Sequence, residues 1–266
     1  MPSWRLLDLD THNAFMNMAI DEAILTARIS NLVPNTVRFY RWLPSAVSVG
    51  KFQDVEKEAH VPNCRKFGVD IVRRITGGGT VYHDSQGEIT YSVIIDKRDL
   101  GTEDIAAVYS RIYSGLVEAL RILGVTSDFN EGDARKCPNL TVKGKKISGS
   151  AQSHKRGVVL QHGTLLIDAD LERMFTFLGA STGRVCLDLP NLARNKITSL
   201  KGELGCTVSI QDVTAALTQG FGAAFNSNPV VSGLTSIEQT TAKRLYADKY
   251  STIEWNFHGI TQQQTC

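Results

Sequence analysis

The residues best suited to chemistry are concentrated around three consecutive glycines. Residues 73–84 read Arg-Arg-Ile-Thr-Gly-Gly-Gly-Thr-Val-Tyr-His-Asp, between two short apolar runs. Exposed backbone N–H groups in a Gly-rich turn form a concavity that binds anions, and an arginine fork suits phosphate or carboxylate. A flexible hairpin tip is the alternative that the glycines alone allow. The glycine spacing matches neither the dinucleotide fingerprint nor the Walker loop, so a phosphate bound here requires another architecture.

Two later segments combine small residues with polar or basic ones. Residues 139–151 carry Asn139, three lysines and then Ser-Gly-Ser-Ala, and residues 162–164 (His-Gly-Thr) lie inside an apolar run. Glycine within a strand often marks the close approach of a ligand or of another backbone. If both segments adjoin residues 74–84 in one sheet, the three together line a basic cleft. Such a cleft suits a phosphate ester, a carboxylate or a mixed anhydride of the two.

The whole chain has the composition of an ordinary soluble protein. Its 266 residues, 42% of them hydrophobic and 21% charged, suffice for one large domain or two small ones. The net charge of +2 gives no bulk electrostatic signal for nucleic acid or an anionic membrane surface. The five cysteines are scattered without Cys-x-x-Cys spacing, which argues against a disulfide framework and a structural zinc site. These features predict a cytoplasmic protein, and an organellar location stays open.

Hydrophobic periodicity predicts the elements that must position these segments. Strands are expected at 4–10, 36–42, 46–50 and 158–167, and a further pair within 139–152 is joined at Lys143-Gly144. The Gly-rich turn is expected to join a strand ending at residue 72 to a return arm at 90–95, as a hairpin. Helices are expected at 13–30, 54–67 (split by Pro62), 102–123, 170–178, 209–225 and 236–250.

The order of these elements predicts the fold class. Strands mostly precede helices along the chain, which is the pattern of an α+β protein. We therefore expect a mixed β-sheet flanked by helices, with residues 1–180 forming the catalytic core. Residues 181–266 are expected to form a C-terminal helical part of the same domain.

Several motifs resemble those of the lipoate–protein ligase A family. They are residues 73–84, 144–151 (Gly-Lys-Lys-Ile-Ser-Gly-Ser-Ala), 162–166 (His-Gly-Thr-Leu-Leu), 17–23, 37–42 and 249–256, in the order that the family has them. The resemblance spans nearly the whole chain and implies the fold of the biotin/lipoyl ligase catalytic domain. It is a resemblance to the short form without the C-terminal accessory domain, for which a separate small accessory subunit is a possible partner.

In that family, lipoate (or octanoate) and ATP give an acyl-adenylate, and a lysine of a lipoyl carrier domain then takes the acyl group. The resemblance implies this ATP-dependent ligase activity here, with Lys146 as the catalytic residue that stabilises charge at the reacting carboxylate and phosphate. It implies Mg²⁺ held mainly by the phosphates and no metal ligands from the protein. The implied partner is a lipoyl carrier domain of the E2, glycine-cleavage H or related type, and neither nucleic acid nor a membrane is expected.

The resemblance also assigns the other site residues, position by position. Arg74, Gly79, Thr80, Val81 and Tyr82 are expected at the nucleotide, and Asn139 at a phosphate or Mg²⁺. The other residues expected in the groove for ATP or acyl-adenylate are Gly77, Gly78, His83, Gly149, Ala151, His162 and Thr164. From the residues alone, Lys146 could also be a solvated hairpin lysine, and His83 a satisfied structural histidine.

Two other functions stay open. A sister group transfers octanoyl from an acyl carrier protein through a cysteine thioester, without ATP. Cys137 could be that nucleophile, because its basic neighbours Arg135 and Lys136 lower a thiol pKa. The second alternative is a non-catalytic subunit that binds the lipoyl carrier, although Lys146 and the intact glycine run argue against it. The Gly-Gly-Gly-x-Val-Tyr-His-Asp motif resembles the ligase form, so the ligase is the preferred interpretation.

Overall fold

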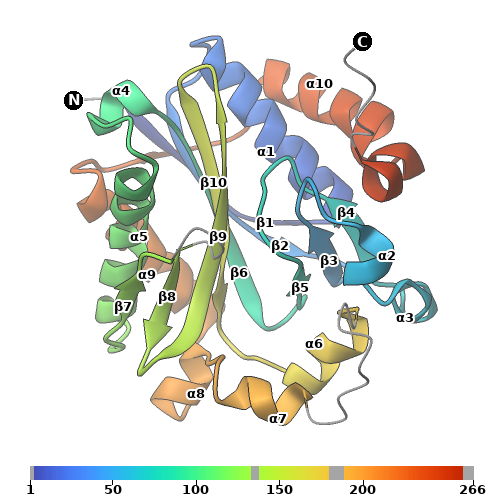
Figure 1. Cartoon of the computed structure of the whole chain (residues 1–266). Coiled ribbons are helices and arrows are strands. Elements are labelled where there is room, and N and C mark those ends of the chain that lie inside the picture. Colours follow the sequence, from blue (N-terminus) through green and yellow to red (C-terminus); the bar gives the residue numbers. More distant parts are fainter. Residues whose placement is uncertain (1–2, 133–137, 180–188, 260–266) are drawn as a thin grey trace.

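The computed structural model describes residues 3–132, 138–179 and 189–259, which form two β-sheets with helices packed around them (Figure 1). The larger sheet has eight strands in the order β11-β1-β2-β6-β10-β9-β8-β7. Their bounds are β1 Trp4–His12, β2 Asn35–Trp42, β6 Glu88–Asp96, β7 Asp128–Asn130, β8 Asn139–Val142, β9 Lys145–Lys155, β10 Val158–Leu166 and β11 Val230–Ser232. β1 runs parallel to β2 and β11, and the remaining pairs are antiparallel. The expected mixed sheet of an α+β protein is confirmed.

The smaller sheet holds the Gly-rich segment in a way that the sequence did not predict. Its central strand β3 (Ala46–Val49) pairs in parallel with β4 (Asp70–Arg73) and antiparallel with β5 (Val81–His83). The glycines therefore connect two strands that are separated by β3, and β6 belongs to the larger sheet. The predicted hairpin is wrong, because residues 74–80 are long enough to cross the end of a central strand, whereas direct hairpins usually have shorter turns.

Helices cover both faces of the larger sheet (Figure 1). α5 (Ile105–Ile122) and α9 (Ile210–Ala224) pack against each other over the largest apolar cluster. α1 (Ala14–Ile29) and α10 (Ser236–Leu245) pack together over the opposite face. The side chain of Asn13 accepts the N–H of Met16 and caps α1, as its position before the apolar run predicts. Residues beyond 180 thus contribute to the same layers as the core, while the proposed division at residue 180 stays a prediction.

The remaining helices are short. They are α2 Val55–Glu58, α3 Val61–Phe67, α4 Lys97–Leu100, α6 Leu171–Phe177, α7 Leu189–Arg194, α8 Leu200–Leu204 and two π-helical turns, η1 Tyr246–Tyr250 and η2 Glu254–His258. The expected split within 54–67 is present, but it falls before Pro62, which lies in the first turn of α3, where proline loses no helical hydrogen bond. The two short edge strands, β7 and β11, and the π-helical turns were not foreseen.

Arg73 joins the smaller sheet to the C-terminal turns. Its guanidinium is 2% exposed and donates to the carbonyls of Trp255 and Asn256, and to those of Gly50 and Gln53. A buried guanidinium is tolerated only when its donors are paired. The interaction therefore fixes three segments to one another: the end of β4, the loop after β3 and η2.

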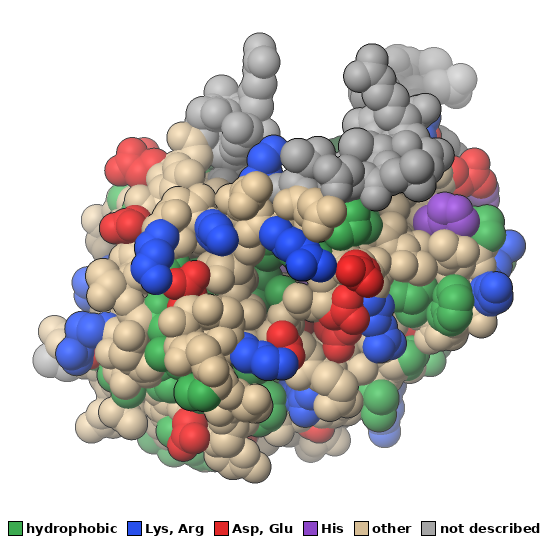
Figure 2. Space-filling view, turned by 90° about the horizontal axis from the view of Figure 1, so that it is seen from below, with side chains coloured by type: hydrophobic (Ala, Val, Ile, Leu, Met, Phe, Trp, Pro, Cys, Tyr) green, Lys and Arg blue, Asp and Glu red, His purple; other side chains and the backbone are tan. Residues whose placement is uncertain are grey.

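Figure 2 shows the end of the molecule that α6, α7 and α8 form. Basic and acidic side chains alternate there, for example in the ion pairs Lys201–Asp168 at 2.7 Å and Arg194–Glu172 at 3.3 Å. This face carries no continuous field of one sign, in agreement with the small net charge. Within residues 3–132, 138–179 and 189–259, no helix is both long enough and apolar enough to cross a membrane.

Candidate active site

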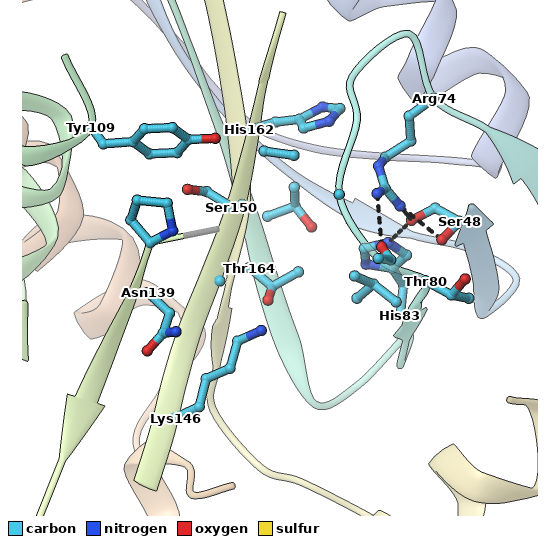
Figure 3. Close-up of a pocket in the computed structure, with 18 of the residues that line it drawn as sticks. Ser48, Arg74, Thr80, His83, Tyr109, Asn139, Lys146, Ser150, His162 and Thr164 are labelled. Atoms are coloured by element: carbon cyan, nitrogen blue, oxygen red, sulfur yellow. Dashed lines mark hydrogen bonds between the residues drawn. The ribbon is translucent and has the colours of Figure 1, made fainter. Parts of the chain in front are cut away.

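A cavity of about 910 Å³ lies between the two sheets and the N-terminus of α5. One wall is the loop of residues 74–80 with β3 and β5, and the opposite wall is formed by β8, β9 and β10 (Figure 3). The cavity brings together the three segments that the sequence singled out. They do not share one sheet as expected, because residues 74–84 belong to the smaller sheet and its loop.

The Gly-rich wall is held in place by Arg74, which is 4% exposed. Its guanidinium donates to both the carbonyl and the hydroxyl of Ser48 at 2.7 Å. It also donates to the carbonyls of Gly77 at 3.1 Å and Gly79 at 2.9 Å. These bonds join the loop to β3 and to itself, so Arg74 braces the loop within the protein. Its expected place at a nucleotide phosphate remains a prediction. These contacts weaken that prediction, because they already occupy donors of the guanidinium.

His83 is fixed on the same wall between two polar partners. Its Nδ1 lies 2.7 Å from Oε1 of Glu88, to which it donates, and its Nε2 lies 2.7 Å from the hydroxyl oxygen of Ser48. The ring also stacks on Trp42 with a centroid distance of 3.9 Å. Both ring nitrogens are therefore occupied, and the exposed part of His83 offers the cavity a flat ring surface.

The opposite wall carries Lys146, at the start of β9. Its backbone N–H donates to the carbonyl of Lys196 at 2.8 Å, and its carbonyl accepts from Thr198 N–H at 2.9 Å. The side chain is exposed to the cavity and extends from β9 toward Thr164 (Figure 3). Asn139 of β8 lies beside it, and its side-chain Oδ1 is buried without a hydrogen-bond partner among the described residues.

A buried acid lies behind the cavity, between α1 and the larger sheet. The carboxylate of Asp21 accepts from Arg38 at 2.7 Å, Tyr40 at 3.1 Å, Ser92 at 2.9 Å and Nδ1 of His162 at 3.1 Å. Burial would raise the pKa of Asp21, but the charge of Arg38 and the hydrogen bond to His162 outweigh it, so this pKa is lowered. Asp21 therefore stays ionised and holds these side chains in fixed orientations.

His162 lines the cavity in front of this acid. Burial lowers its pKa, although Asp21 opposes the shift. A neutral ring that donates from Nδ1 to Asp21 has Nε2 as an acceptor, and the hydroxyl of Thr76 lies 2.8 Å from that nitrogen. His162 therefore connects β10 to the Gly-rich loop, in addition to any contact with a ligand.

Most of the expected site residues line this one cavity. They are Arg74, Gly78, Gly79, Thr80, Val81, His83, Asn139, Lys146, Gly149, Ala151, His162 and Thr164. Gly77 and Tyr82 do not line it: the Tyr82 ring is 2% exposed and stacks on Phe177 in a separate core. The roles assigned to all of these residues remain predictions.

The sequence did not assign a site role to the rest of the lining, although Ser150 and Gly163 lie in segments that it singled out. The additional residues are Met18, Tyr40, Trp42, Ser48, Thr90, Asp104, Ile105, Ala106, Tyr109, Glu131, Pro138, Ser150 and Gly163. Several are apolar residues of predicted helices and strands, where periodicity assigns them to the core. Nothing in a sequence pattern separates a side chain that faces a core from one that faces an apolar ligand.

Cys137, the candidate nucleophile, lies outside the described residues. Pro138, the next residue in the sequence, lines the cavity and its carbonyl accepts a hydrogen bond from the hydroxyl of Tyr113 at 3.0 Å. The hydroxyl of Ser150, in turn, donates to that of Tyr113 at 2.8 Å. The end of β8 that follows Cys137 in sequence is therefore fixed at the cavity wall.

The fixed charges of the described lining cancel. Arg74 and Lys146 are positive, whereas Asp104 and Glu131 are negative. No cluster of three or more potential metal-ligating His, Cys, Asp or Glu side chains occurs in the described parts of the chain. This balance suits a substrate with little net charge better than a nucleoside triphosphate, because a site for a triphosphate needs an excess of positive groups.

Comparison with curated proteins identifies relatives that span the chain. It is 35% identical to "Octanoyltransferase LipM" of Clostridioides difficile over 96% of this chain and 99% of the relative. It is 31% identical to the protein of the same name from Bacillus subtilis, over 96% and 98%. These names contradict the expectation of an ATP-dependent ligase and favour the octanoyltransferase alternative. The motifs that resemble the ligase form therefore do not identify a ligase in this chain.

Solved structures with the same architecture come from the ligases. A lipoate-protein ligase A bound with ATP matches with a TM-score of 0.81 and 30% identity over 96% of this chain and 98% of that one. The bipartite lipoate protein ligase of Thermoplasma acidophilum, described with its E2 lipoyl domain, matches with a TM-score of 0.83 and 29% identity over the whole of both chains. The expected fold is thereby confirmed.

The family model described as "Lipoyl protein ligase A/B catalytic domain" matches residues 13–222. That stretch contains the Gly-rich loop, the Lys146 hairpin and His162, which together surround the cavity. The chain therefore belongs to the lipoyl protein ligase A/B catalytic domain family.

Proposed function

We propose that the protein is an octanoyltransferase that moves an octanoyl group from an acyl carrier protein to a lysine of a lipoyl carrier domain. The observation that carries the proposal is its full-length similarity to proteins named octanoyltransferase, at 31–37% identity. The cancelling charges of the described part of the cavity lining support it, because an acyl thioester is uncharged at its reacting end. The scattered cysteines fit a cytoplasmic setting, where a reactive thiol stays reduced.

The proposed reaction has two acyl transfers. The Cys137 thiolate attacks the carbonyl carbon of the octanoyl thioester, the carbon–sulfur bond to the donor breaks, and the donor leaves as a thiol after taking up a proton. The amine of the acceptor lysine then attacks the octanoyl–Cys137 thioester. An amide forms, the amine loses a proton and the Cys137 thiol is regenerated, so ATP and Mg²⁺ are not needed.

Lys146 is the cation best placed to assist both steps. Each attack places negative charge on the carbonyl oxygen of a tetrahedral intermediate, and a fixed donor at that oxygen lowers the barrier by about 3–4 kcal/mol. The Lys146 ammonium extends into the cavity from a backbone whose N–H and carbonyl are both hydrogen-bonded. Asn139, with its unpartnered Oδ1, and Thr164 are the polar groups beside it.

The apolar lining is suited to the octanoyl chain. Trp42, Tyr40 and Met18 form part of the cavity surface, and all three are almost completely buried. Lipoyl and octanoyl chains differ little in apolar surface, and such differences are worth only about 1–3 kcal/mol in a hydrophobic pocket. We propose octanoyl as the transferred group because the relatives are named octanoyltransferases. The same pocket can also hold a lipoyl chain.

The acceptor is proposed to be a lipoyl carrier domain. The related ligase of Thermoplasma acidophilum was described with its E2 lipoyl domain, which supports an acceptor of this type. An E2 domain and a glycine-cleavage H-type carrier both present a lysine to the second step, and the assay can use either.

Mass spectrometry of the intact protein after incubation with octanoyl-acyl carrier protein tests the proposal. We expect the mass to rise by one octanoyl group that is released by hydroxylamine, and amide to form on a lipoyl domain without ATP. Cys137→Ser should abolish both, whereas Cys206→Ser, which removes an exposed thiol, should change neither. Transfer that requires ATP, or an undiminished Cys137→Ser variant, would overturn the proposal.

A further inference from the structure

We propose that Gly149 is a positioning residue whose missing side chain provides the space in which Lys146 lies. This inference rests on the proposed function for its effect on turnover, but its geometric part does not. Lys146 and Gly149 are three residues apart in β9, and both line the cavity. In a regular strand, residues three apart point to opposite faces, so the local backbone has to differ from a regular strand.

A β-bulge supplies that difference. In the β8–β9 pair, Leu140 lies opposite Ser148 and Thr141 lies opposite Lys146, which leaves Ile147 as an extra residue on β9. Ile147 and Ser148 are both buried, at 0% and 1% exposure, although they are consecutive. A bulge redirects the side chains on one side of it, and here it turns Lys146 toward the face of the sheet that Gly149 occupies.

The backbone of Lys146 cannot shift easily to accommodate a change. Its N–H and carbonyl are bonded to Lys196 and Thr198 on one side, and β8 flanks it on the other. Movement of the Lys146 ammonium therefore has to come from rotation within its own side chain.

Gly149 lies at the centre of the same wall. It is opposite Asn139 in β8 and opposite Thr164 in β10, and both of these residues line the cavity. A Cβ atom added to Gly149 would lie 2.5 Å from Cε of Lys146 and closer still to its Nζ. Carbon atoms without a bond between them do not approach so closely, so a methyl group here displaces the end of the Lys146 side chain.

Gly163 of β10, which lies beside Gly149, differs from it because the fold itself requires a glycine there. A Cβ on Gly163 would lie 2.5 Å from the carbonyl oxygen of Gly149 and 2.7 Å from both Cβ of Ser150 and the hydroxyl of Tyr91. These atoms belong to the sheet and its packed core and cannot move aside. At Gly149 the displaced atoms belong instead to the end of a long flexible side chain. The fold therefore tolerates a methyl group there, but the methyl group moves the ammonium out of its position.

The consequence concerns the oxygen at which charge develops. Lys146 has several rotatable bonds, and a preorganised donor loses much of its effect when it is misplaced by about 1 Å, at a cost of about 100-fold in rate. The space at residue 149 keeps the Lys146 ammonium above β9, between Asn139 of β8 and Thr164 of β10.

The test is the variant Gly149→Ala, with Gly233→Ala as the matched control because a Cβ at that exposed glycine meets no atom within 4 Å. We expect kcat for octanoyl transfer to fall about 100-fold in Gly149→Ala, with KM for the octanoyl carrier protein and the melting temperature unchanged. A crystal structure should show Nζ of Lys146 displaced by about 1 Å or more. Gly233→Ala should match the wild type in every measurement.

The double variant Gly149→Ala/Lys146→Ala makes the test independent of turnover. Because the lysine is gone, the methyl group has room, so the double variant should melt at the temperature of Lys146→Ala alone. Wild-type kcat, an Nζ that stays in place, or a loss of melting temperature that persists in the double variant would each overturn the inference. If the wild type itself transfers no octanoyl, the proposed function fails, and the crystal structure and melting temperatures still decide the inference.

Discussion

The two walls of the cavity use their polar groups in opposite ways. On the Gly-rich wall, Arg74 donates to the carbonyls of its own loop and of β3, and His83 is held by Glu88 and Ser48. On the opposite wall, the side chain of Lys146 extends into the cavity from a backbone that neighbouring segments hold. The first wall is a frame, and the second carries Lys146, the group that we propose acts on the substrate.

Under this proposal, the most prominent motif in the sequence does not contain the reacting groups. Paired arginines, three glycines and a histidine suggest phosphate binding when they are considered as residue types. In the structure, the side chains of Arg73, Arg74 and His83 have their hydrogen-bonding groups occupied within the protein. A side chain is available for chemistry only after its structural partners have been counted.

The largest expected effect is that of Lys146→Ala. Loss of the donor at the developing oxyanion should reduce kcat for octanoyl transfer about 100- to 1000-fold, measured as amide formed on a lipoyl domain under saturating donor. Lys143→Ala is the control, because this lysine lies in the same hairpin but pairs with Glu203 at 3.0 Å and does not line the cavity. Equal losses in the two variants would remove the distinction between the acting wall and its surroundings.

The next effect separates a bracing arginine from one that binds a ligand. Arg74→Met should lower the free energy of unfolding by about 3 kcal/mol, because buried loop carbonyls lose a charged donor, as measured by urea denaturation without substrate. Arg111→Met, at an exposed position of α5, should stay within about 0.5 kcal/mol of the wild type. A stable Arg74→Met protein with impaired substrate binding would show that Arg74 belongs to the acting wall.

A pH effect tests the link between the walls through His162. Its pKa is lowered in the folded state, so between that value and about 6.5 the unfolded state binds more protons and stability falls as the pH falls. His162→Gln should remove up to about 1.4 kcal/mol per pH unit from the slope of unfolding free energy between pH 7 and 5.5. Burial and the charge of Lys97 also lower the pKa of His154, so this residue contributes to the slope that remains in the variant. An unchanged slope in the variant would mean that His162 is not held neutral.

The smallest effect is expected at Gly79. A Cβ there meets no atom within 4 Å, and its φ lies outside the range that disfavours other residues. Gly79→Ala should therefore change the unfolding free energy by less than about 0.5 kcal/mol and kcat by less than about threefold, in contrast to the same methyl group at Gly149. A loss at Gly79 as large as that at Gly149 would mean that the frame's backbone contacts the reacting atoms.

The sequence predicted most elements that have a long periodic pattern. The bounds of α1, α5 and α9 follow from apolar spacing and from caps such as Asn13. The predicted turn at Lys143-Gly144 is also confirmed, because Gly144 has a φ of 77°, which favours glycine. Local chemistry sufficed in these cases.

The rest depended on partners that are distant in sequence. The separation of β4 and β5 by β3, and the addition of β11 beside β1, are choices of strand pairing that no local pattern specifies. The same holds at the site: the residue type and motif of Arg74 suggested a ligand-binding role, whereas its hydrogen bonds to Ser48 depend on tertiary structure. The motifs of this sequence favoured the ligase, and the similarity to curated octanoyltransferases was needed to correct that choice.

The contacts of Arg73 have a consequence for synthesis on the ribosome. Its donors reach carbonyls of residues 255–257, which are made about 180 residues later. Until that part of the chain has left the ribosome, a guanidinium that is buried in the finished protein lacks several of its acceptors. We therefore expect a chain that stops just before residue 255 to leave the end of β4 and the adjoining Gly-rich loop open to added protease, although it contains all eight strands of the larger sheet.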